Sequence, residues 1–282
     1  SSVSVSGKSK TRLGEPWDLI IIGGGITGAG VLREAVRLGL RTLLVEKRDF
    51  GWGTSSRSSK LVHGGLRYLK EGRLRLTRAS VRERQRLLEE GPGLIDPLGF
   101  LLATYKGDHT GRWTYSAGLS VYDLLALQWT HRHYSPQDFQ MLAPHIALDG
   151  LEGGFRYGDA QTDDARLVLR VIREAASSGP AALALNYVAA EELLRNGGGP
   201  GGCVKGVRLR DQVTGRCTDV SARVVINATG SWADTLRRQV QAPARLRPLR
   251  GSHLIFPAWR LPVAQAVSFL HPVDGRPVFI FP

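Results

Sequence analysis

The sequence predicts an α/β fold in which a parallel-sheet unit is combined with a second unit built mostly on antiparallel strands. Residues 17–22 form an unbroken apolar run that stops at a glycine, which is typical of a parallel strand covered on both faces. A helical pattern over residues 26–38 and a second apolar run over residues 41–46 follow directly. Residues 204–210 and 217–226, on either side of a Thr-Gly turn, predict a hairpin and therefore antiparallel strands.

Size and composition indicate a folded protein that attracts anions. With 282 residues, 42% of them hydrophobic and 22% charged, the chain can bury a substantial core as one large or two smaller domains. The net charge of +13 favours phosphorylated metabolites, acidic lipid headgroups or nucleic acid, although an Arg-rich composition explains part of the excess without any function. No CxxC, recognition-helix or RNP-like string supports nucleic acid, so it is not an expected partner.

Three further features of the sequence bear on disulfide bonds, on membrane spans and on a leader segment. Cys203 and Cys217 are too few for a disulfide framework and lack metal-ligand spacing, so we expect reduced thiols and no metal. No apolar run approaches the roughly 20 residues that span a bilayer, so any membrane contact is expected to be peripheral. Residues 1–16 open with a Ser-rich, basic string and are expected to be a disordered leader, the alternative being the remnant of an organelle-targeting segment.

The glycine-rich loop after the first apolar run predicts a dinucleotide site. Gly23 permits a tight turn, Gly25 leaves room for a pyrophosphate against the backbone, and Gly28 lets the helix pack closely on the strand. The start of the helix adds amide donors and the positive end of its dipole. Glu46 ends the second strand, and its offset from Gly28 along the sequence is close to that expected of a carboxylate that binds ribose hydroxyls.

Two later segments favour FAD over NAD. Residues 49–69 carry a run of small hydroxyl side chains that offers donors to a second phosphate group and to a polar ring. Residues 222–228 form another apolar run that enters the turn Thr229-Gly230, a second strand-to-helix turn placed to return to the dinucleotide domain.

The string TSSRSSKLVHGGLRYL at residues 54–69 resembles the signature of the FAD-dependent glycerol-3-phosphate dehydrogenases of the bacterial aerobic and mitochondrial type. Further stretches that fit the same family are GGGITGAG (23–30), YGDAQTDDARLVL (157–169), VINATGSWAD (225–234) and LRGSHLIFP (249–257). The family's chains continue beyond the equivalent of Pro282, so the resemblance implies an N-terminal fragment. The family residues expected to hold the substrate phosphate and to close the isoalloxazine site would lie partly in the missing part.

The resemblance implies a Rossmann-like FAD-binding domain of the GR2/DAO type with a mostly antiparallel-sheet substrate domain inserted. We expect residues 17–90 and 150–240 in the FAD-binding domain and residues 91–149 and 241–282 in the substrate domain, which would be incomplete at its C-terminal end. The 204–226 hairpin is expected in the antiparallel sheet that separates the substrate from the FAD domain.

Oxidation of a secondary alcohol needs a hydride acceptor, a base for the hydroxyl proton and cations for a phosphate. His63 is the favoured base because imidazole titrates near neutral pH, with His253 as its competitor and a purely structural histidine as the alternative. By resemblance Arg67 and Tyr68 contact the substrate, Arg67 as a bidentate phosphate ligand unless it is only a surface cation. The residues expected to bind FAD are Gly23, Gly25, Gly28, Glu46, Thr54, Ser55, Ser56, Ser59, Lys60, His63, Gly64, Ala228, Thr229 and Gly230.

Two helical patterns lie in the middle of the chain. Residues 74–90 are strongly basic, and we favour a solvated helix over a membrane-surface or acidic-partner face. In that helix the residues expected to face a core are Leu74, Val81, Leu87 and Leu88, and those expected mostly outward are Arg75, Arg78, Arg82, Arg84 and Arg86. Residues 113–129 are aromatic-rich at helical spacing, and core packing is favoured over quinone access or bilayer docking. Acids at residues 163 and 164 open the next helix, where they suit its dipole.

The leading functional hypothesis is the oxidation of sn-glycerol 3-phosphate to dihydroxyacetone phosphate through FAD, with electrons passed to a quinone. The alternatives are an amine or hydroxy-acid oxidase of the same superfamily that uses oxygen, and a non-catalytic FAD-binding module. The partners expected are the phosphorylated polyol, a quinone, a membrane surface and a second copy of the chain in a homodimer. The expected location is the cytoplasmic face of a bacterial inner membrane, with the mitochondrial inner membrane as the alternative.

Overall fold

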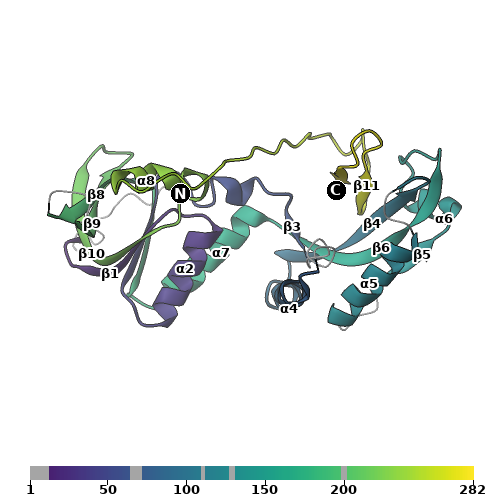
Figure 1. Cartoon of the computed structure of the whole chain (residues 1–282). Coiled ribbons are helices and arrows are strands. Elements are labelled where there is room, and N and C mark those ends of the chain that lie inside the picture. The colour runs from purple at the N-terminus through teal and green to yellow at the C-terminus, as the bar shows by residue number, and fades with distance from the viewer. Residues whose placement is uncertain (1–12, 64–71, 109–111, 127–130, 198–201) are drawn as a thin grey trace. The chain divides into compact units, whose positions relative to one another are not determined.

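The structure, a computed structural model, describes residues 13–63, 72–108, 112–126, 131–197 and 202–282. The chain forms two units, each made of two separate stretches (Figure 1). The first unit contains Ser1–Lys60 and Asp163–Arg250, and the second contains Leu61–Thr162 and Gly251–Pro282. Each unit has its own sheet and its own apolar core.

The first unit is built on a six-stranded mixed sheet in the order β7-β2-β1-β10-β9-β8. Strands β1 (Trp17–Ile22), β2 (Thr42–Glu46), β7 (Ala182–Asn186) and β10 (Cys217–Asn227) run parallel, as the apolar runs predicted for β1 and β2. Strands β9 (Cys203–Asp211) and β8 (Val188–Asn196) continue the sheet in antiparallel fashion from β10. The predicted hairpin is therefore present as β9 and β10.

Both faces of this sheet are covered by apolar side chains. Helices α2 (Ile26–Arg37) and α7 (Asp164–Ser177) lie side by side on one face, where Leu32 and Val168 are fully buried (Figure 1). On the other face Trp17 packs with Val207 and with Leu236 of α8 (Ala233–Gln239). Burial on both faces explains why β1 and β2 consist mostly of apolar residues.

The second unit is built on a mostly antiparallel sheet in the order β12-β11-β4-β6-β3. Its long strands are β4 (Ile95–Tyr105) and β6 (Leu151–Thr162), and β5 (Arg132–Tyr134) also pairs with β6. The other elements of this unit are β3 (Leu61–Val62), α4 (Leu74–Glu90), α5 (Arg112–Ala126), α6 (Pro136–Leu142), β11 (Ala266–Leu270) and β12 (Pro277–Ile280). No helix among the described residues is long and apolar enough to cross a membrane.

The boundaries between the units differ from those expected. Residues 61–90 and 150–162 belong to the second unit, because α4 packs on that unit's core through Val81 and β6 pairs with β4 along its whole length. Residues 241–250 belong to the first unit. The β9-β10 hairpin also belongs to the first unit, since β10 pairs directly with β1.

The expected leader is also shorter than residues 1–16. Residues 1–12 lie outside the described part of the chain, but Leu13 is buried in the core cluster of the first unit, and Glu15 forms an ion pair with Arg41 at 2.5 Å. Residues 13–16 are therefore ordered and not part of a disordered leader.

Helix α4 has the predicted bounds, and its orientation is as predicted for Val81, which is buried, and for the exposed Arg75, Arg78, Arg82 and Arg86, but not for two residues. Arg84, expected outward, is buried, whereas Leu74, expected inward, is 52% exposed. The buried stripe is Thr77, Val81 and Arg84, which matches the helical repeat of three to four residues. In α5, Leu119 and Tyr122 are buried in the core as predicted.

Candidate functional site

The glycine loop is shaped by contacts that leave no room for side chains. Gly23 has a φ of +115°, and a Cβ there would lie 2.4 Å from the carbonyl oxygen of Ala228. A Cβ on Gly28 would lie 1.9 Å from the carbonyl oxygen of Gly23. The backbone amide of Ala228 donates to the carbonyl of Ile22 at 2.8 Å. Glycine at positions 23 and 28 therefore lets the loop, the helix and the turn after β10 meet.

Glu46 ties the end of β2 to this loop. Its Oε2 accepts from the Gly24 amide at 2.8 Å, and its Oε1 accepts from the Arg48 amide at 2.9 Å. A carboxylate has about four lone-pair sites, so these two bonds leave capacity for ribose hydroxyls. The predicted ribose ligand is therefore held in a fixed orientation beside the glycine loop.

The start of α2 has the features of an anion site. Gly25 precedes the helix without a side-chain cap, and the first turn contains no acid. Ser55, in the short 3-10 helix η1 (Thr54–Ser56), accepts from the Ile26 amide through its Oγ at 3.0 Å. A Cβ on Gly25 would lie 3.0 Å from that Oγ, so only glycine leaves this approach open. The amides of the first turn and the helix dipole are suited to a pyrophosphate.

The rest of the hydroxyl-rich segment is held by a long-range carboxylate. Asp164, at the start of α7, accepts from Ser58 Oγ and from Lys60 Nζ, both at 2.7 Å. Burial alone would raise the pKa of Asp164, but the hydrogen bonds from Lys60 and Ser58 outweigh it and hold that pKa below 3.8. The Lys60 ammonium, expected at the cofactor, is thus paired with Asp164, while Ser59 lies between these two anchored residues.

The turn after β10 completes the first unit's loops. Asn227 Oδ1 accepts from the Thr229 hydroxyl at 2.7 Å, and Asn227 Nδ2 donates to the Ala233 carbonyl at 2.9 Å. Gly230 has a φ of +58° and opens the short 3-10 helix η2 (Gly230–Trp232). The structure thus brings Ala228 against the glycine loop, as the second glycine turn predicted.

These residues fit a dinucleotide cofactor. The glycine loop is a cradle that a Cβ would fill, the start of α2 supplies amide donors, and Glu46 keeps acceptor capacity. Among the described residues, no cluster of three or more His, Cys, Asp or Glu side chains could hold a metal ion.

A second candidate site, within the second unit, is centred on His63. The Nδ1 of His63 lies 2.8 Å from Asp159 Oδ2. The Asp159 side chain is only 2% exposed, whereas that of His63 is 47% exposed. The imidazole ring also lies near Phe100 and Phe279, with centroid distances of 6.1 and 6.5 Å. A buried carboxylate therefore holds one ring nitrogen of a histidine whose ring reaches solvent.

Arg84 continues this arrangement into the core. Its guanidinium lies 3.4 Å from Asp159 Oδ1 and donates to the Tyr122 hydroxyl and to the Gly158 carbonyl, both at 2.8 Å. Burial and the charge of Asp159 raise the pKa of Tyr122 and hold that of Tyr157 well above 10. The two tyrosines therefore stay neutral, and the Tyr122 hydroxyl accepts a hydrogen bond from Arg84.

The described residues do not test every prediction for this site. Arg67, Tyr68 and Gly64 lie outside the described residues, so their roles stay predictions. His253 is described and exposed, in an irregular stretch after Arg250, and no hydrogen bond or ion pair among the described residues joins it to His63.

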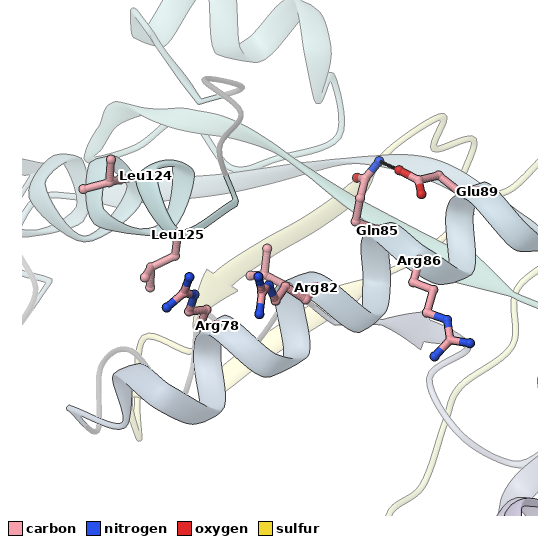
Figure 2. A pocket seen from close by; sticks show the side chains of 8 residues that line it. Arg78, Arg82, Gln85, Arg86, Glu89, Leu124 and Leu125 are labelled. Atoms are coloured by element: carbon pink, nitrogen blue, oxygen red, sulfur yellow. Dashed lines mark hydrogen bonds between the residues drawn. The ribbon is translucent and has the colours of Figure 1, made fainter.

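Helices α4 and α5 of the second unit border an open groove of about 390 Å³ (Figure 2). Arg78, Arg82 and Arg86 come from α4, and Leu124 and Leu125 come from α5. In the part of the chain that the structure describes, no ion pair joins Arg78 or Arg82 to an acid, while Arg86 pairs with Glu90 at 2.7 Å. The groove therefore combines cations with apolar walls.

No role in a functional site was predicted from the sequence for Asp159, Asp164 or Arg84. The two carboxylates lie within the stretch 157–169, but their partners are separated from them by 75 to 106 residues, which local pattern does not show. A signal did exist for Arg84, because it lies on the same helical stripe as Thr77 and Val81.

Comparison with known proteins is consistent with a site for a dinucleotide cofactor. The chain matches the FAD dependent oxidoreductase (DAO) family over residues 18–282. It is 38% identical over 278 residues to the aerobic glycerol-3-phosphate dehydrogenase of Staphylococcus haemolyticus, covering 97% of this chain and 49% of the relative. It is 41% identical over 271 residues to the enzyme of that name from Bacillus subtilis, covering 94% and 48%. The chain spans about half the length of the curated relatives it matches.

Solved structures show the same likeness. The glycerol-3-phosphate dehydrogenase from Bacillus halodurans complexed with FAD matches with a TM-score of 0.71 and 32% identity, over 98% of this chain and 48% of that chain. The L-proline dehydrogenase from P. horikoshii matches with a TM-score of 0.63 at 16% identity, over 94% of this chain and 69% of that chain, which shows the fold alone. With its glycine loop and a match over residues 18–282, the chain belongs to the FAD dependent oxidoreductase family.

Proposed function

We propose that this chain is part of a flavoenzyme that oxidises sn-glycerol 3-phosphate to dihydroxyacetone phosphate. The relatives with the longest matches carry the name of that activity. The observation that carries the proposal is the pairing of His63 with the buried Asp159 at 2.8 Å, because it presents an oriented imidazole as a base.

The chemistry separates into three tasks. FAD, when bound, accepts the hydride from C2 of the substrate. His63 takes the C2 hydroxyl proton, so that a carbonyl forms and two electrons leave the substrate. Arg67, with Tyr68 as a neutral donor, binds the phosphate dianion in this proposal, because a guanidinium matches phosphate oxygens in pairs.

The proposal continues to the electron acceptor and the location. A quinone receives the two electrons and two protons, and the protein associates peripherally with the cytoplasmic face of a bacterial inner membrane. The arginines of the α4-α5 groove and the exposed Leu74 (52%) and Leu124 (60%) support this part, since basic residues beside apolar ones favour acidic lipid surfaces. That the protein forms a homodimer stays a prediction, which sedimentation analysis can test.

The first experiment follows the flavin spectrum of the full-length protein without oxygen. We expect bleaching on addition of sn-glycerol 3-phosphate and none with sn-glycerol 1-phosphate, glycine or lactate. The variant His63→Asn should retain flavin and bleach at least about 100-fold more slowly, in the range that general-base removal costs. Wild-type bleaching rates in this variant would remove His63 as the base.

A second experiment separates the acceptors. Reduced protein should pass electrons to a soluble quinone analogue much faster than to oxygen, and rapid peroxide formation would favour the oxidase alternative. For the membrane, co-sedimentation with vesicles of acidic phospholipid should exceed that with neutral vesicles and weaken in high salt. The variant Arg78→Gln/Arg82→Gln should lose this preference while Arg166→Gln, which changes an exposed arginine of the first unit, should keep it.

A further inference from the structure

We propose that Asp159, anchored by Arg84, is a positioning residue that fixes the ring tautomer of His63 so that Nε2 is the proton acceptor. This inference rests on the proposed function for its catalytic consequence, but its structural part can be tested without any substrate. It assigns roles to two buried residues that belong to different elements, β6 and α4.

The tautomer follows from the hydrogen-bonding capacity of a carboxylate. An ionised Asp159 can only accept hydrogen bonds, so the proton of a neutral His63 must sit on Nδ1, which lies 2.8 Å from Asp159 Oδ2. The lone pair is then on Nε2, at the opposite side of the ring. A base must carry its lone pair where the hydroxyl proton arrives, so the tautomer decides whether His63 can act.

Arg84 fixes the carboxylate in turn. The two oxygens of Asp159 are divided, with Oδ2 against His63 and Oδ1 3.4 Å from the Arg84 guanidinium. Arg84 is itself held by the Tyr122 hydroxyl and the Gly158 carbonyl. Because both charged side chains are at most 5% exposed, their geometry is set by packing rather than by solvent.

This division of oxygens makes the variant Asp159→Asn informative. Arg84 only donates, so the amide oxygen of an asparagine should face Arg84 and its NH₂ group should face His63. The NH₂ group would donate to Nδ1 and move the ring proton to Nε2. The variant would thus keep the shape and size of the side chain while presenting the wrong nitrogen to the substrate.

Among the described residues, Asp159, the partner of His63, interacts electrostatically with Arg84 from α4, with Tyr122 from α5 and with Tyr157, which shares β6 with it. Both tyrosines are buried and stay protonated at neutral pH, because burial raises the pKa of each. The two tyrosines therefore add no charge beside Asp159 and Arg84.

The deciding experiment is a long-range ¹⁵N–¹H spectrum of the full-length, flavin-loaded protein labelled at histidine. The His63 signals are identified by their loss in His63→Asn and recorded above the pH at which the ring loses its charge. We expect the Nδ1–H tautomer in the wild type and the Nε2–H tautomer in Asp159→Asn. A wild-type Nε2–H tautomer overturns the proposal, and that measurement needs no variant to fold.

Steady-state kinetics with sn-glycerol 3-phosphate gives the second readout. Removing a carboxylate that fixes a catalytic histidine tautomer costs about 10⁴-fold in kcat in serine proteases, so we expect Asp159→Asn to lower kcat at least about 100-fold. We expect KM to stay within about 3-fold, because the Asp159 side chain is only 2% exposed and so offers no surface for substrate binding. A rise in KM with kcat unchanged would also overturn the proposal.

The chain offers a matched control in the same unit. His131 Nδ1 lies 2.6 Å from Asp123 Oδ2, and the Asp123 side chain is 1% exposed. The variant Asp123→Asn makes the same change in another buried Asp-His pair and should leave kcat and the His63 tautomer unchanged. If Asp159→Asn lowers kcat no more than Asp123→Asn, the positioning role is overturned. If the tautomers are as expected but the wild type is not reduced by sn-glycerol 3-phosphate, the tautomer assignment stands and the proposed function fails.

Discussion

Ser58 and Asp164 are 106 residues apart in the sequence, yet the Ser58 hydroxyl donates to Asp164 Oδ2 at 2.7 Å. The same carboxylate accepts from the Lys60 ammonium at 2.7 Å. Asp164 therefore fixes both ends of the short segment that contains Ser59. The hydroxyl-rich stretch owes its conformation to a residue that begins another helix.

The variant Asp164→Asn should destabilise the protein by about 2 kcal/mol at pH 7, because hydrogen bonds to a charged group are worth roughly 1.5–3 kcal/mol. The folded pKa of Asp164 lies below the ordinary value of 3.8, so its contribution is full above that value and is lost as the pH falls through the folded pKa. Urea unfolding at pH 7 and at acid pH measures this. The exposed Asp149→Asn is the control, and a difference that persists unchanged in acid would contradict the assignment.

The variant Gly28→Ala should abolish flavin retention. Its Cβ would overlap the Gly23 carbonyl at 1.9 Å, so either the loop or α2 must move. Gly30→Ala is the matched control in the same helix, since a Cβ there meets nothing within 4 Å, and it should bind flavin normally. Alanine in a helix is favoured over glycine by about 1 kcal/mol, so the control should also be slightly more stable. Flavin released on gel filtration distinguishes the two variants.

Alkaline pH should unfold the second unit through its buried tyrosines. The pKa values of Tyr122 and Tyr157 are raised in the folded state, so stability is full below pH 10 and falls as the pH rises above it, when the unfolded chain releases both protons. Each tyrosine contributes a slope of about 1.4 kcal/mol per pH unit. For Tyr122→Phe, the slope of the unfolding free energy against pH between pH 9 and 11 should correspond to one proton fewer than in the wild type. An unchanged slope would exclude Tyr122 as a source of this pH dependence.

The variant Arg67→Lys tests the phosphate ligand. Lysine keeps the charge but not the paired donors, so KM for sn-glycerol 3-phosphate should rise by a larger factor than kcat falls. Anaerobic flavin reduction over a range of substrate concentrations gives both constants. Identical kinetics in the two proteins would exclude a bidentate role for Arg67.

The parts of the fold that follow local rules could be predicted from the sequence. Strand β1, helix α2 and helix α4 were located within one residue, because their apolar periods and glycines are local signals. The domain boundaries could not be predicted, since they depend on which sheet α4 packs against. The predicted orientation of Arg84 was wrong because a charged residue was assigned to the surface, whereas its Nη1 is buried and donates to a carboxylate and a tyrosine hydroxyl.

The same distinction holds for the site. The glycines and Glu46 belong to one continuous motif, and the structure brings them together with Ala228. Asp159 and Asp164 act on residues far away in the sequence, so only the folded chain reveals them. The roles of Arg67, Tyr68 and His253 stay predictions.

The pairing of β3 with β6 joins Leu61 to Gln161, so the first and last strands of the stretch between Lys60 and Asp163 run side by side. Residues 61–162 can therefore be regarded as an inserted segment whose two ends are held next to each other by its own strand pairing. Closing a loop of about 100 residues costs about 4 kcal/mol of chain entropy, and here the inserted segment's own sheet supplies that closure. Replacing residues 61–162 with a short glycine-serine linker should therefore leave a shorter chain that still forms the β7-β2-β1-β10 sheet. The first unit would then be a scaffold that can accept different inserted domains at this position.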